Sequence, residues 1–336
     1  MESYENRKGV GLVLSGGGGK GAYEIGVWRA LDEYGVSPNI CAVSGTSVGA
    51  LNAALFVQRD RIYAEQVWST ISPDAILTLQ SLPYYARFLT GVPGHFRLAH
   101  RMVLLNKMFN WISKIFAAQG LFSKKGLGKL IDQNVSLHDV CAFPGPVCAA
   151  AFNLDQIRLE YFDLRASSSS EELRDQLLAS ASIPVVFGKT YVNGHLYWDG
   201  GLPEVGDNTP VKPLYDAGYR NIIVVHLNRE SPVDRSRFPG CRLIEIMPQE
   251  DLGGVRGTLN FSADRAVENM ERGYDDTVRI LEPLRRTGVA LFQLENALIE
   301  MQTERRKFGA EKNNLDQQNQ KVSREIDTIL DQYVKE

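Results

Sequence analysis

The 336-residue sequence contains few cysteines and histidines, four of the first and five of the second. The cysteines stand singly, without a C-x-x-C pair or a nearby histidine cluster, at Cys41, Cys141, Cys148 and Cys241. This spacing gives neither the ligand set of a zinc site nor the thiol pair of a redox motif. We therefore predict reduced, mostly buried thiols, no metal ion and no other cofactor.

Long hydrophobic runs are also missing. No stretch reaches the roughly 18 apolar residues of a membrane-spanning helix, and the first apolar run, Val10–Leu14, is shorter than a signal-peptide core. The net charge is only −3 and the isoelectric point about 6.0, which gives no general attraction to nucleic acid. These absences predict a cytoplasmic protein without a nucleic-acid partner.

The chain does contain enough apolar sequence for a large core, because 44% of its residues are hydrophobic and 23% are charged. The run Val10–Leu14 predicts a strand, which ends at five small residues from Ser15 to Gly19. Apolar residues then recur at spacings of three and four as far as Gly35, which predicts a helix with a glycine cap. The first unit is thus a strand, a glycine-rich turn and a helix.

The same order of elements follows a second time. Residues 40–43 predict a strand, residues 45–49 a turn and residues 50–57 the start of a helix. Strands that alternate with helices are typical of a parallel sheet covered on both faces, so we predict an α/β fold. Further strands are expected at 146–152 and 221–227, and a hairpin around Asn193-Gly194.

A serine occupies the centre of the second turn, in the pattern G-x-S-x-G formed by Gly45, Ser47 and Gly49. Between a strand and a helix, this pattern holds the hydroxyl on a tight turn at the carboxyl end of the sheet. The N-terminus of the following helix favours negative charge that develops there. We predict that Ser47 is a nucleophile; the alternative is a turn whose serine only caps the helix.

The first turn contains a run of glycines around a lysine: Gly16, Gly17, Gly18, Gly19, Lys20 and Gly21. Backbone amides without side chains can converge on a nucleotide phosphate, a dinucleotide pyrophosphate or the oxyanion of an acyl intermediate. A P-loop requires Ser or Thr where this chain has Gly21, and Asp32 and Glu33 come too early for a dinucleotide-binding unit. The oxyanion interpretation remains, and it fits a nucleophile at Ser47.

Two residues are candidates for the base that activates Ser47. Asp199 ends the predicted hairpin and precedes Gly200 and Gly201, which let the backbone run close to the nucleophile turn. Burial of an aspartate raises its basicity. Among the histidines only His226 follows Asp199, the chain order of an α/β-hydrolase triad. We favour a direct Ser47–Asp199 dyad and keep a triad with His226 as the alternative.

These motifs, in this order, resemble the patatin-like phospholipase family: G-G-G-x-[KR]-G at 16–21, G-x-S-x-G at 45–49 and D-G-G at 199–201. Segments 179–187 and 208–210 look like bacterial members, which extends the resemblance over roughly residues 9 to 227. Ser15 stands where the plant-type pattern often has an aspartate.

The resemblance implies a three-layer α/β/α fold and hydrolysis of acyl esters in phospholipids or other lipids, without a metal. It implies a nucleophile at Ser47, a proton acceptor at Asp199 and an oxyanion hole at Gly16, Gly17, Gly18 and Gly19. The remaining motif residues have a supporting role: Lys20, Gly21, Gly45, Gly49, Gly200 and Gly201. No specific role is assigned to Lys20.

From Ala75 to Ile131 the chain has no acidic residue and eight basic ones, interleaved with aromatic side chains. Such a mixture suits an anionic membrane surface, so we predict a peripheral membrane contact here. The alternative is a set of ordinary helices whose basic faces meet solvent. The candidates for lipid contact are Arg97, Arg101, Lys107, Lys114, Lys124, Lys125 and Lys129.

The chain changes character after Gly288. Apolar residues recur every seven positions from Leu294 to Ile329, with a companion register that starts at Leu291, a pattern typical of a coiled coil. Polar residues in the companion register, and Gly309, weigh against it. We predict a homo-oligomer formed through residues 289–336. The alternatives are a broken helix or helical hairpin, docking onto the domain, and disorder.

The sequence thus predicts a catalytic domain over residues 1–255 that includes the basic segment, its terminal helix over 256–288, and a helical tail over 289–336. The predicted function is a serine acyl hydrolase of the phospholipase A type that acts on lipids at a membrane surface. Two alternatives stay open, a soluble esterase or thioesterase and a non-catalytic lipid-binding module.

Overall fold

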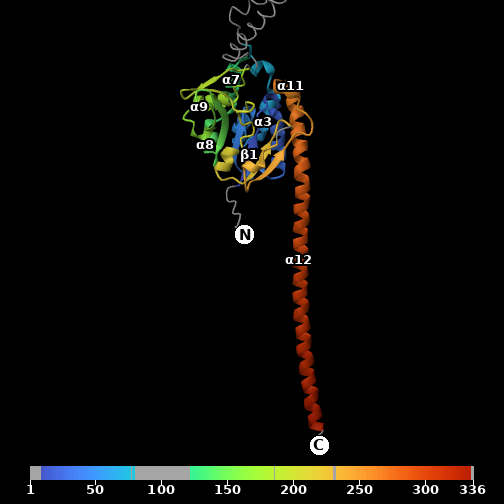
Figure 1. The fold of residues 1–336 in the computed structure, drawn as a ribbon. Helices are drawn as coiled ribbons and strands as arrows, with labels where there is room; N and C mark the ends of the chain where they lie inside the picture. The colour runs from blue at the N-terminus through green and yellow to red at the C-terminus, as the bar shows by residue number, and fades with distance from the viewer. Residues whose placement is uncertain (1–8, 77, 80–121, 185, 230–231, 334–336) are drawn as a thin grey trace, which may run out of the picture. The chain divides into compact units, whose positions relative to one another are not determined.

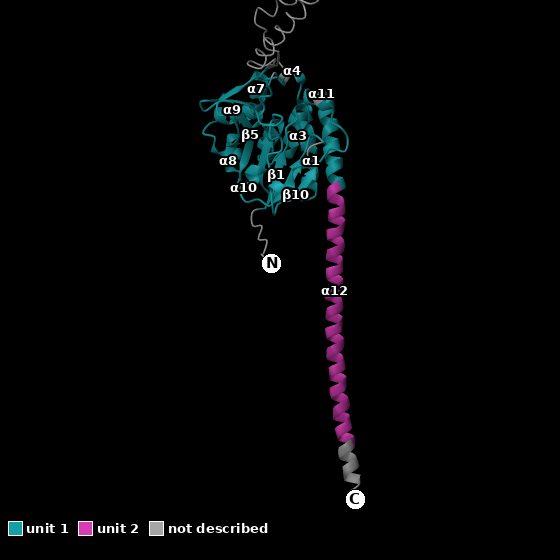
Figure 2. Cartoon of the chain, in the orientation of Figure 1, with its two compact units in different colours: residues 1–279 teal, residues 280–336 magenta. Residues whose placement is uncertain are grey.

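The computed structural model describes residues 9–76, 78–79, 122–184, 186–229 and 232–333. The chain forms two compact units, residues 1–279 and residues 280–336 (Figure 2). The boundary between them falls inside the last helix, between the two domain boundaries that the sequence predicts.

Unit 1 is built on a sheet with the strand order β10-β9-β1-β2-β5-β8-β7, in which β6 also pairs with β5. The strands from β10 to β5 are parallel to their neighbours, whereas β6, β7 and β8 are antiparallel. The strand bounds are β1 Val10–Leu14, β2 Ile40–Thr46, β5 Val147–Asn153, β6 Arg158–Asp163, β7 Thr190–Val192, β8 His195–Asp199, β9 Asn221–Val225 and β10 Arg242–Ile246. A separate antiparallel pair consists of β3 (Thr78–Leu79) and β4 (Phe122–Ser123).

Helices precede and follow most of these strands (Figure 1). Their bounds are α1 Ala22–Glu33, α2 Val48–Phe56, α3 Arg61–Thr70, α4 Pro73–Ile76, α7 Lys125–Asn134, α8 Leu137–Ala142, α9 Ser170–Ser180, α10 Lys212–Asp216, α11 Gly254–Thr258 and α12 Ala263–Tyr333. Short 3-10 turns cover η1 Gly18–Gly21, η2 Ser37–Asn39, η4 Leu164–Ala166 and η5 Arg235–Arg237.

The side chains of β1 show how the layers form, because successive residues of a strand point to opposite faces. Leu12 and Leu14 border a small cavity together with Ile25 of α1 and Phe56 of α2. Val13, between them, belongs to a buried cluster with Leu214 of α10. Both faces of the sheet are therefore covered by helices, and the predicted three-layer α/β/α fold is confirmed.

The elements expected around the two glycine-containing turns are present, and so is the hairpin, in which Asn193 and Gly194 have positive φ angles of 48° and 88°. The helix cap predicted at Gly35 has a φ of 68°. Strands β6 and β10 were not predicted, because both carry charged residues within short runs. Their presence makes the sheet wider, and the antiparallel strands make it mixed.

The first part of α12 packs tightly against α1 within unit 1. A Cβ atom on Gly26 would lie 1.8 Å from the carbonyl oxygen of Met270, and one on Gly273 would lie 2.0 Å from that of Tyr23. The buried Tyr23 hydroxyl also donates a hydrogen bond to Asp276 (3.1 Å). Two glycines thus allow the backbones of the helices to approach closely.

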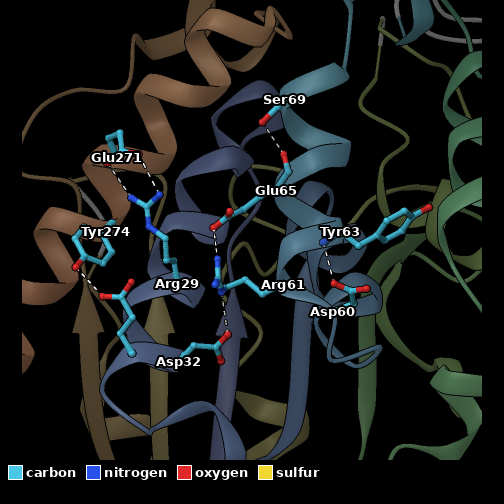
Figure 3. A network of polar contacts seen from close by, with 10 residues as sticks. Arg29, Asp32, Asp60, Arg61, Tyr63, Glu65, Ser69, Glu271 and Tyr274 are labelled. Atoms are coloured by element: carbon cyan, nitrogen blue, oxygen red, sulfur yellow. Dashed lines mark hydrogen bonds and ion pairs between the residues drawn. The ribbon is translucent and has the colours of Figure 1, made fainter.

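Polar contacts surround this crossing (Figure 3). Arg29 of α1 donates two hydrogen bonds to Glu271 of α12 (3.0 and 2.8 Å), and its guanidinium lies 4.4 Å from the centre of the Tyr274 ring. Arg61 at the start of α3 pairs with Asp32 of α1 (3.0 Å). These pairs are partly exposed, so the glycine crossing and the buried tyrosine are the stronger determinants of how the helices pack.

Candidate active site

Ser47 lies on a strained turn between β2 and α2. Its φ angle is 56°, in the left-handed region that non-glycine residues rarely adopt. A Cβ atom on Gly45 would lie 2.2 Å from the carbonyl oxygen of Gly49, and one on Gly49 would lie 2.2 Å from that of Leu14. Only glycine fits at these two positions, so the structure has the sharp strand-to-helix turn that the G-x-S-x-G pattern predicts.

Strand β5 brings the ends of β2 and β8 together. Residues 148–153 of this strand pair with β6 on one edge. On the other edge, β2 pairs with the first half of β5 as far as Ala150, opposite Thr46, and β8 pairs with the second half from Ala151, opposite Asp199. The two strands therefore meet end to end along one edge of β5, and Ser47, the residue after Thr46, comes close to Asp199.

Gly200 and Gly201 lie at this junction. A Cβ atom on Gly200 would lie 2.4 Å from the carbonyl oxygen of Ala150 on β5. One on Gly201 would lie 3.2 Å from Oδ1 of Asp199 and 3.4 Å from the methyl group of Thr46. The glycines of the D-G-G motif thus let the chain pass between the two strand ends.

The Asp199 carboxyl group is buried, with 5% of the residue exposed. Oδ1 accepts a hydrogen bond from the Gly201 amide (2.7 Å), and Oδ2 has no hydrogen-bond partner among the described residues. Burial raises the pKa of Asp199 from its ordinary 3.8 to about 6, and the nearby Ser47 hydroxyl and the Gly201 amide partly oppose this shift. Near neutral pH this carboxylate is ionised yet markedly more basic than an exposed aspartate.

Two serines, one at the end of α9 and one just after it, were not singled out by the sequence analysis, and they hold the backbone of both residues. The Ser47 amide donates to the hydroxyl of Ser180 (2.9 Å), and the Asp199 amide donates to the carbonyl oxygen of Ser182 (2.9 Å). Both serines are fully buried. One short segment therefore fixes Ser47 and Asp199 relative to each other.

The glycine loop lies directly beside Ser47. A Cβ atom on Gly16 would be 3.2 Å from the Cβ atom of Ser47, and Gly18, with a φ of 57°, borders the same cavity as Ser47. The amide of Gly16 already donates to the carbonyl oxygen of Asn208 (3.2 Å). Outside their own 3-10 turn, the amides of Gly17, Gly18 and Gly19 have no backbone acceptor in the described part of the chain. Of the four glycines predicted as oxyanion donors, Gly16 is thus the one whose amide is engaged.

Residues 207 and 208 connect the three motifs, a role that sequence reasoning missed. Asn208 bonds to the backbone of Gly16 through its carbonyl oxygen and its side-chain amide (both 3.2 Å). The Asp207 amide donates to the carbonyl oxygen of Gly200 (2.7 Å), and the Thr46 hydroxyl donates to the carbonyl oxygen of Asp207 (2.7 Å). The only sequence signal was the Asn208-Thr209-Pro210 segment.

Lys20 and Gly21 follow the loop into α1. Gly21 lies where a Cβ atom would be 2.5 Å from the side chain of Val48. Lys20 is 8% exposed and lies beside Gly257 of α11. Burial lowers its pKa, and the charge of Asp251 partly offsets this effect. The lysine therefore packs against the segment around α11.

A cavity of about 730 Å³, part of it open to solvent, extends from Ser47 and Gly18. Helix α2 contributes Val48, Leu51, Asn52 and Leu55 to its lining; the rest comprises Val67, Trp68, Ile71, Ile76, Leu127, Leu130, Ile131, Asn134, Val135, Ala181, Ile183, Phe187 and Phe261. Nearly all of these side chains are apolar. The nucleophile turn thus lies at one wall of a hydrophobic cavity.

The alternative triad is wrong. His226 is buried at the end of β9, and its Nε2 contacts Oε2 of Glu245 on β10 (3.1 Å). The same carboxylate accepts hydrogen bonds from Arg235 and from the Val233 amide (both 2.9 Å). Burial lowers the pKa of His226. The histidine belongs to a structural cluster between β9 and β10, because its partner is Glu245 and not Asp199.

The predicted lipid-contact residues differ in their exposure. Lys124 is partly buried, and its ammonium donates to the Lys189 carbonyl oxygen (2.6 Å) and to the hydroxyls of Thr190 (2.5 Å) and Ser182 (3.3 Å). Burial lowers its pKa to about 8. Lys124 is therefore a structural residue, which corrects the prediction. Lys125 and Lys129 are exposed on α7. The other candidates, Arg97, Arg101, Lys107 and Lys114, lie outside the described residues.

None of the helices in the described part of the chain is both long enough and apolar enough to cross a membrane.

Comparison with known proteins matches residues 12–215 to the family described as "Patatin-like phospholipase". The chain is similar to "Lysophospholipase NTE1" of Cryptococcus neoformans, with 26% identity over 216 residues, 64% of this chain and 11% of that protein. It is also similar to "Patatin-like phospholipase domain-containing protein 7" of Rattus norvegicus, with 38% identity over 80 residues, 22% of this chain and 6% of that protein.

Among solved structures, the chain is similar to VipD from Legionella pneumophila, with a TM-score of 0.48 and 16% identity over 82% of this chain and 67% of that one. The match spans only 11% and 6% of the length of these two sequence relatives. These relatives are fungal and mammalian proteins, so they give no support to a place among bacterial members. The family match covers more than half of the sequence and includes all three motifs. The chain therefore belongs to the patatin-like phospholipase family.

Proposed function

We propose that this chain is a lipid acyl hydrolase that works through Ser47 and Asp199. The end-to-end arrangement of β2 and β8 along β5 carries the proposal, because it brings a strained serine next to a buried, basic aspartate. The apolar cavity that begins at Ser47 supports an acyl chain as the group that is bound.

In the first half of the reaction, the Ser47 oxygen attacks the ester carbonyl carbon while its proton passes to Asp199. The negative charge moves to the carbonyl oxygen, which the amides of Gly17, Gly18 and Gly19 stabilise. The carbon–oxygen bond of the ester then breaks. The leaving alkoxide takes the proton from Asp199, and the acyl group stays on Ser47.

In the second half, Asp199 accepts a proton from a water molecule that attacks the acyl-enzyme. The same amides stabilise the tetrahedral intermediate. When this intermediate collapses, the Ser47 oxygen is the leaving group, and it takes the proton back from Asp199. The products are a fatty acid and free enzyme. The strained φ of Ser47 keeps its hydroxyl on the turn through both halves.

The substrate class follows from the cavity and from the relatives. A lining with two asparagines among otherwise apolar residues binds a hydrocarbon chain and leaves a polar head group outside. The relatives are named as a lysophospholipase and a phospholipase-domain protein. We therefore expect fatty-acyl esters of phospholipids or lysophospholipids as substrates.

The test measures fatty-acid release from diacyl phospholipid vesicles, from lysophospholipid and from a short soluble ester. We expect lipid hydrolysis by the wild type and a loss of about 10⁴-fold or more in Ser47→Ala. Asp216→Asn, an exposed position on α10, serves as the control and keeps full activity. Lipid hydrolysis that survives in Ser47→Ala refutes the mechanism. Hydrolysis of the short ester alone identifies a soluble esterase, and vesicle binding without any hydrolysis identifies a lipid-binding module.

Peripheral contact with a membrane is a second part of the proposal. Helix α7 has Leu127, Leu130 and Ile131 on the wall of the cavity, while Lys125 and Lys129 are exposed. Cations beside the cavity would meet anionic head groups as the acyl chain enters, at about 1 kcal/mol for each lysine near the surface. This helix can thus orient the cavity toward a lipid surface.

Sedimentation with anionic vesicles tests the role of α7. We expect Lys125→Glu with Lys129→Glu to weaken vesicle binding about tenfold or more, while hydrolysis of the short soluble ester stays unchanged. The control replaces two exposed cations elsewhere in unit 1, Lys212→Glu with Arg242→Glu. Equal sedimentation of the two double variants and the wild type would rule out this membrane contact.

A further inference from the structure

Helix α12 carries a row of exposed apolar side chains through unit 2. Their exposed fractions range from 45% to 69%, whereas in unit 1 most large apolar side chains are buried and the exposed ones are scattered singly along the chain. The row comprises Val289, Leu291, Phe292, Leu294, Leu298, Ile299, Met301, Phe308, Leu315, Val322 and Ile326. Within residues 280–326, whose side chains the structure describes, the rest of the helix does not cover these apolar side chains. A large apolar row of this kind marks an interaction surface.

The row follows a heptad, whose positions are labelled a to g. Position d is apolar in every heptad, from Leu294 at intervals of seven to Ile329. Position a is apolar at both ends, with Leu291 and Leu298 first and Ile326 and Tyr333 last. An apolar position d in all six heptads, together with an apolar position a at both ends, describes the seam of a coiled coil. Phe292 and Ile299, at position b, widen the apolar face only in the first two heptads.

The structure removes one alternative to a coiled coil. Helix α12 runs without a break from Ala263 to Tyr333 and includes Gly309. A helical hairpin or a break at this glycine is therefore excluded in the described chain. An unbroken helix lets the six heptads form one continuous stripe, which a left-handed supercoil keeps against the partner helix.

The polar residues at position a indicate which partner covers the seam. Arg305 and Lys312 occupy position a in the middle of the tail, and each directly follows a glutamate at position g, Glu304 and Glu311. In a parallel, in-register pair of helices, position a of one chain packs beside the preceding g position of the other. Each central cation then meets a glutamate of a second copy. The surface pair Glu304–Lys307 (3.0 Å) within one chain is exposed and too weak to prevent this.

An antiparallel pair lacks this match. There the g positions of the two chains face one another, and here they include Glu304, Glu311 and Glu325 and no cation. Asn319, the third polar residue at position a, pairs with itself only in a parallel, in-register pair, where a buried asparagine specifies two strands. The charges at positions a and g and the polar Asn319 thus favour the parallel, in-register pair.

We propose that residues 291–333 form a parallel, two-stranded, in-register coiled coil with a second copy of this chain. The 336-residue chain is then a dimer, with twice the 37.5 kDa mass of one chain. The proposal is independent of the proposed enzymatic activity.

The first test combines mass and cross-linking of the whole 336-residue chain. Light scattering should give the mass of two chains at micromolar concentration, and Asn319→Cys should form a disulfide-linked dimer under mild oxidation. Gln317→Cys, at position f on the outer face, is the matched control and should remain largely uncrosslinked. A single-chain mass, a mass of three or four chains, or equal cross-linking at 317 and 319 would overturn the proposal.

The second test exchanges charges. Glu304→Lys with Glu311→Lys places like charges beside Arg305 and Lys312, and Arg305→Glu with Lys312→Glu does the same with negative charge. Each double variant alone should dissociate about 100-fold more readily than the wild type. An equimolar mixture of the two should form a heterodimer of wild-type affinity, because every contact is then between opposite charges. Homodimers of undiminished affinity, or no recovery on mixing, contradict the proposed register.

Discussion

The glycines of the nucleophile turn and those of the tail helix differ sharply in their surroundings. At Gly45 and Gly49 an added Cβ atom would lie 2.2 Å from backbone atoms, whereas at Gly288 and Gly309 it would meet nothing within 4 Å. In the first region the chain's own contacts determine the structure. In the second, the large apolar side chains of unit 2 are exposed, and we propose that a second copy of the chain covers them. The same substitution should therefore have opposite effects in the two regions.

The largest effect is expected for Gly49→Ala. The added methyl group would lie 2.2 Å from the carbonyl oxygen of Leu14 and 2.7 Å from that of Ser15, so the backbone of β1 or α2 must move. We expect a loss of about 3 kcal/mol or more in the free energy of unfolding, together with loss of activity. Denaturant unfolding monitored by tryptophan fluorescence measures the loss in the free energy of unfolding. Wild-type stability in this variant would mean that the turn does not have the geometry described above.

Asp199→Asn should separate function from stability in the same region. Because the folded-state pKa is raised from 3.8 to about 6, the folded protein binds more protons than the unfolded chain in this window. The stability contribution of Asp199 is thus present below pH 3.8 and is lost as the pH rises through about 6. Asparagine lacks this penalty, so we expect a gain of up to about 3 kcal/mol at pH 7 and a loss of activity of about 10²- to 10⁴-fold.

Two measurements check this prediction. The thermal unfolding temperatures of Asp199→Asn and of the wild type should converge near pH 4 and diverge toward pH 7. For the wild type, kcat/KM should rise with pH through about 6 and then level off, because only the ionised carboxylate accepts the serine proton. A pH profile without an inflection near 6 would remove Asp199 as the base.

The contrast between the two regions also explains what the sequence could predict. Ser47, Gly45 and Gly49 are neighbours in the chain, and their spacing alone specifies a tight turn between a strand and a helix. The heptads of the tail are equally local. Both features depend on periodicity within one element or on one turn, which a sequence displays directly.

What the sequence could not display depends on pairing between distant segments. No local sequence pattern indicates that β5 pairs with β2 in its first half and with β8 in its second half. This pairing brings Asp199 to Ser47. The serines at 180 and 182 and the connection through Asn208 depend on the same pairing. His226 follows Asp199 in the order of a triad, yet its place in the sheet gives it Glu245 as partner.

A smaller effect should distinguish two adjacent lysines. Lys124→Met removes the ammonium that bonds to Lys189, Thr190 and Ser182, whereas Lys125→Met changes an exposed side chain. We expect Lys124→Met to lower the free energy of unfolding by about 1–2 kcal/mol and Lys125→Met to change it by less than about 0.5 kcal/mol. Urea unfolding of both variants measures the difference. Equal effects would show that the contacts of Lys124 contribute no stability.

The smallest effect, and the opposite sign to Gly49→Ala, is expected for Gly309→Ala. The site is helical and an added Cβ atom would meet nothing within 4 Å, so alanine adds no clash and restricts the unfolded chain. Helix propensity then favours alanine by about 1 kcal/mol. Thermal unfolding of the tail, followed by circular dichroism, should shift to higher temperature. Light scattering should follow the mass of the dimer over the same range. The matched control is Gly288→Ala, which lies before the first heptad: it should raise the helix signal without strengthening the dimer. A tail that weakens on Gly309→Ala would mean that the glycine is needed as a hinge, and a hinge there would break the six-heptad seam.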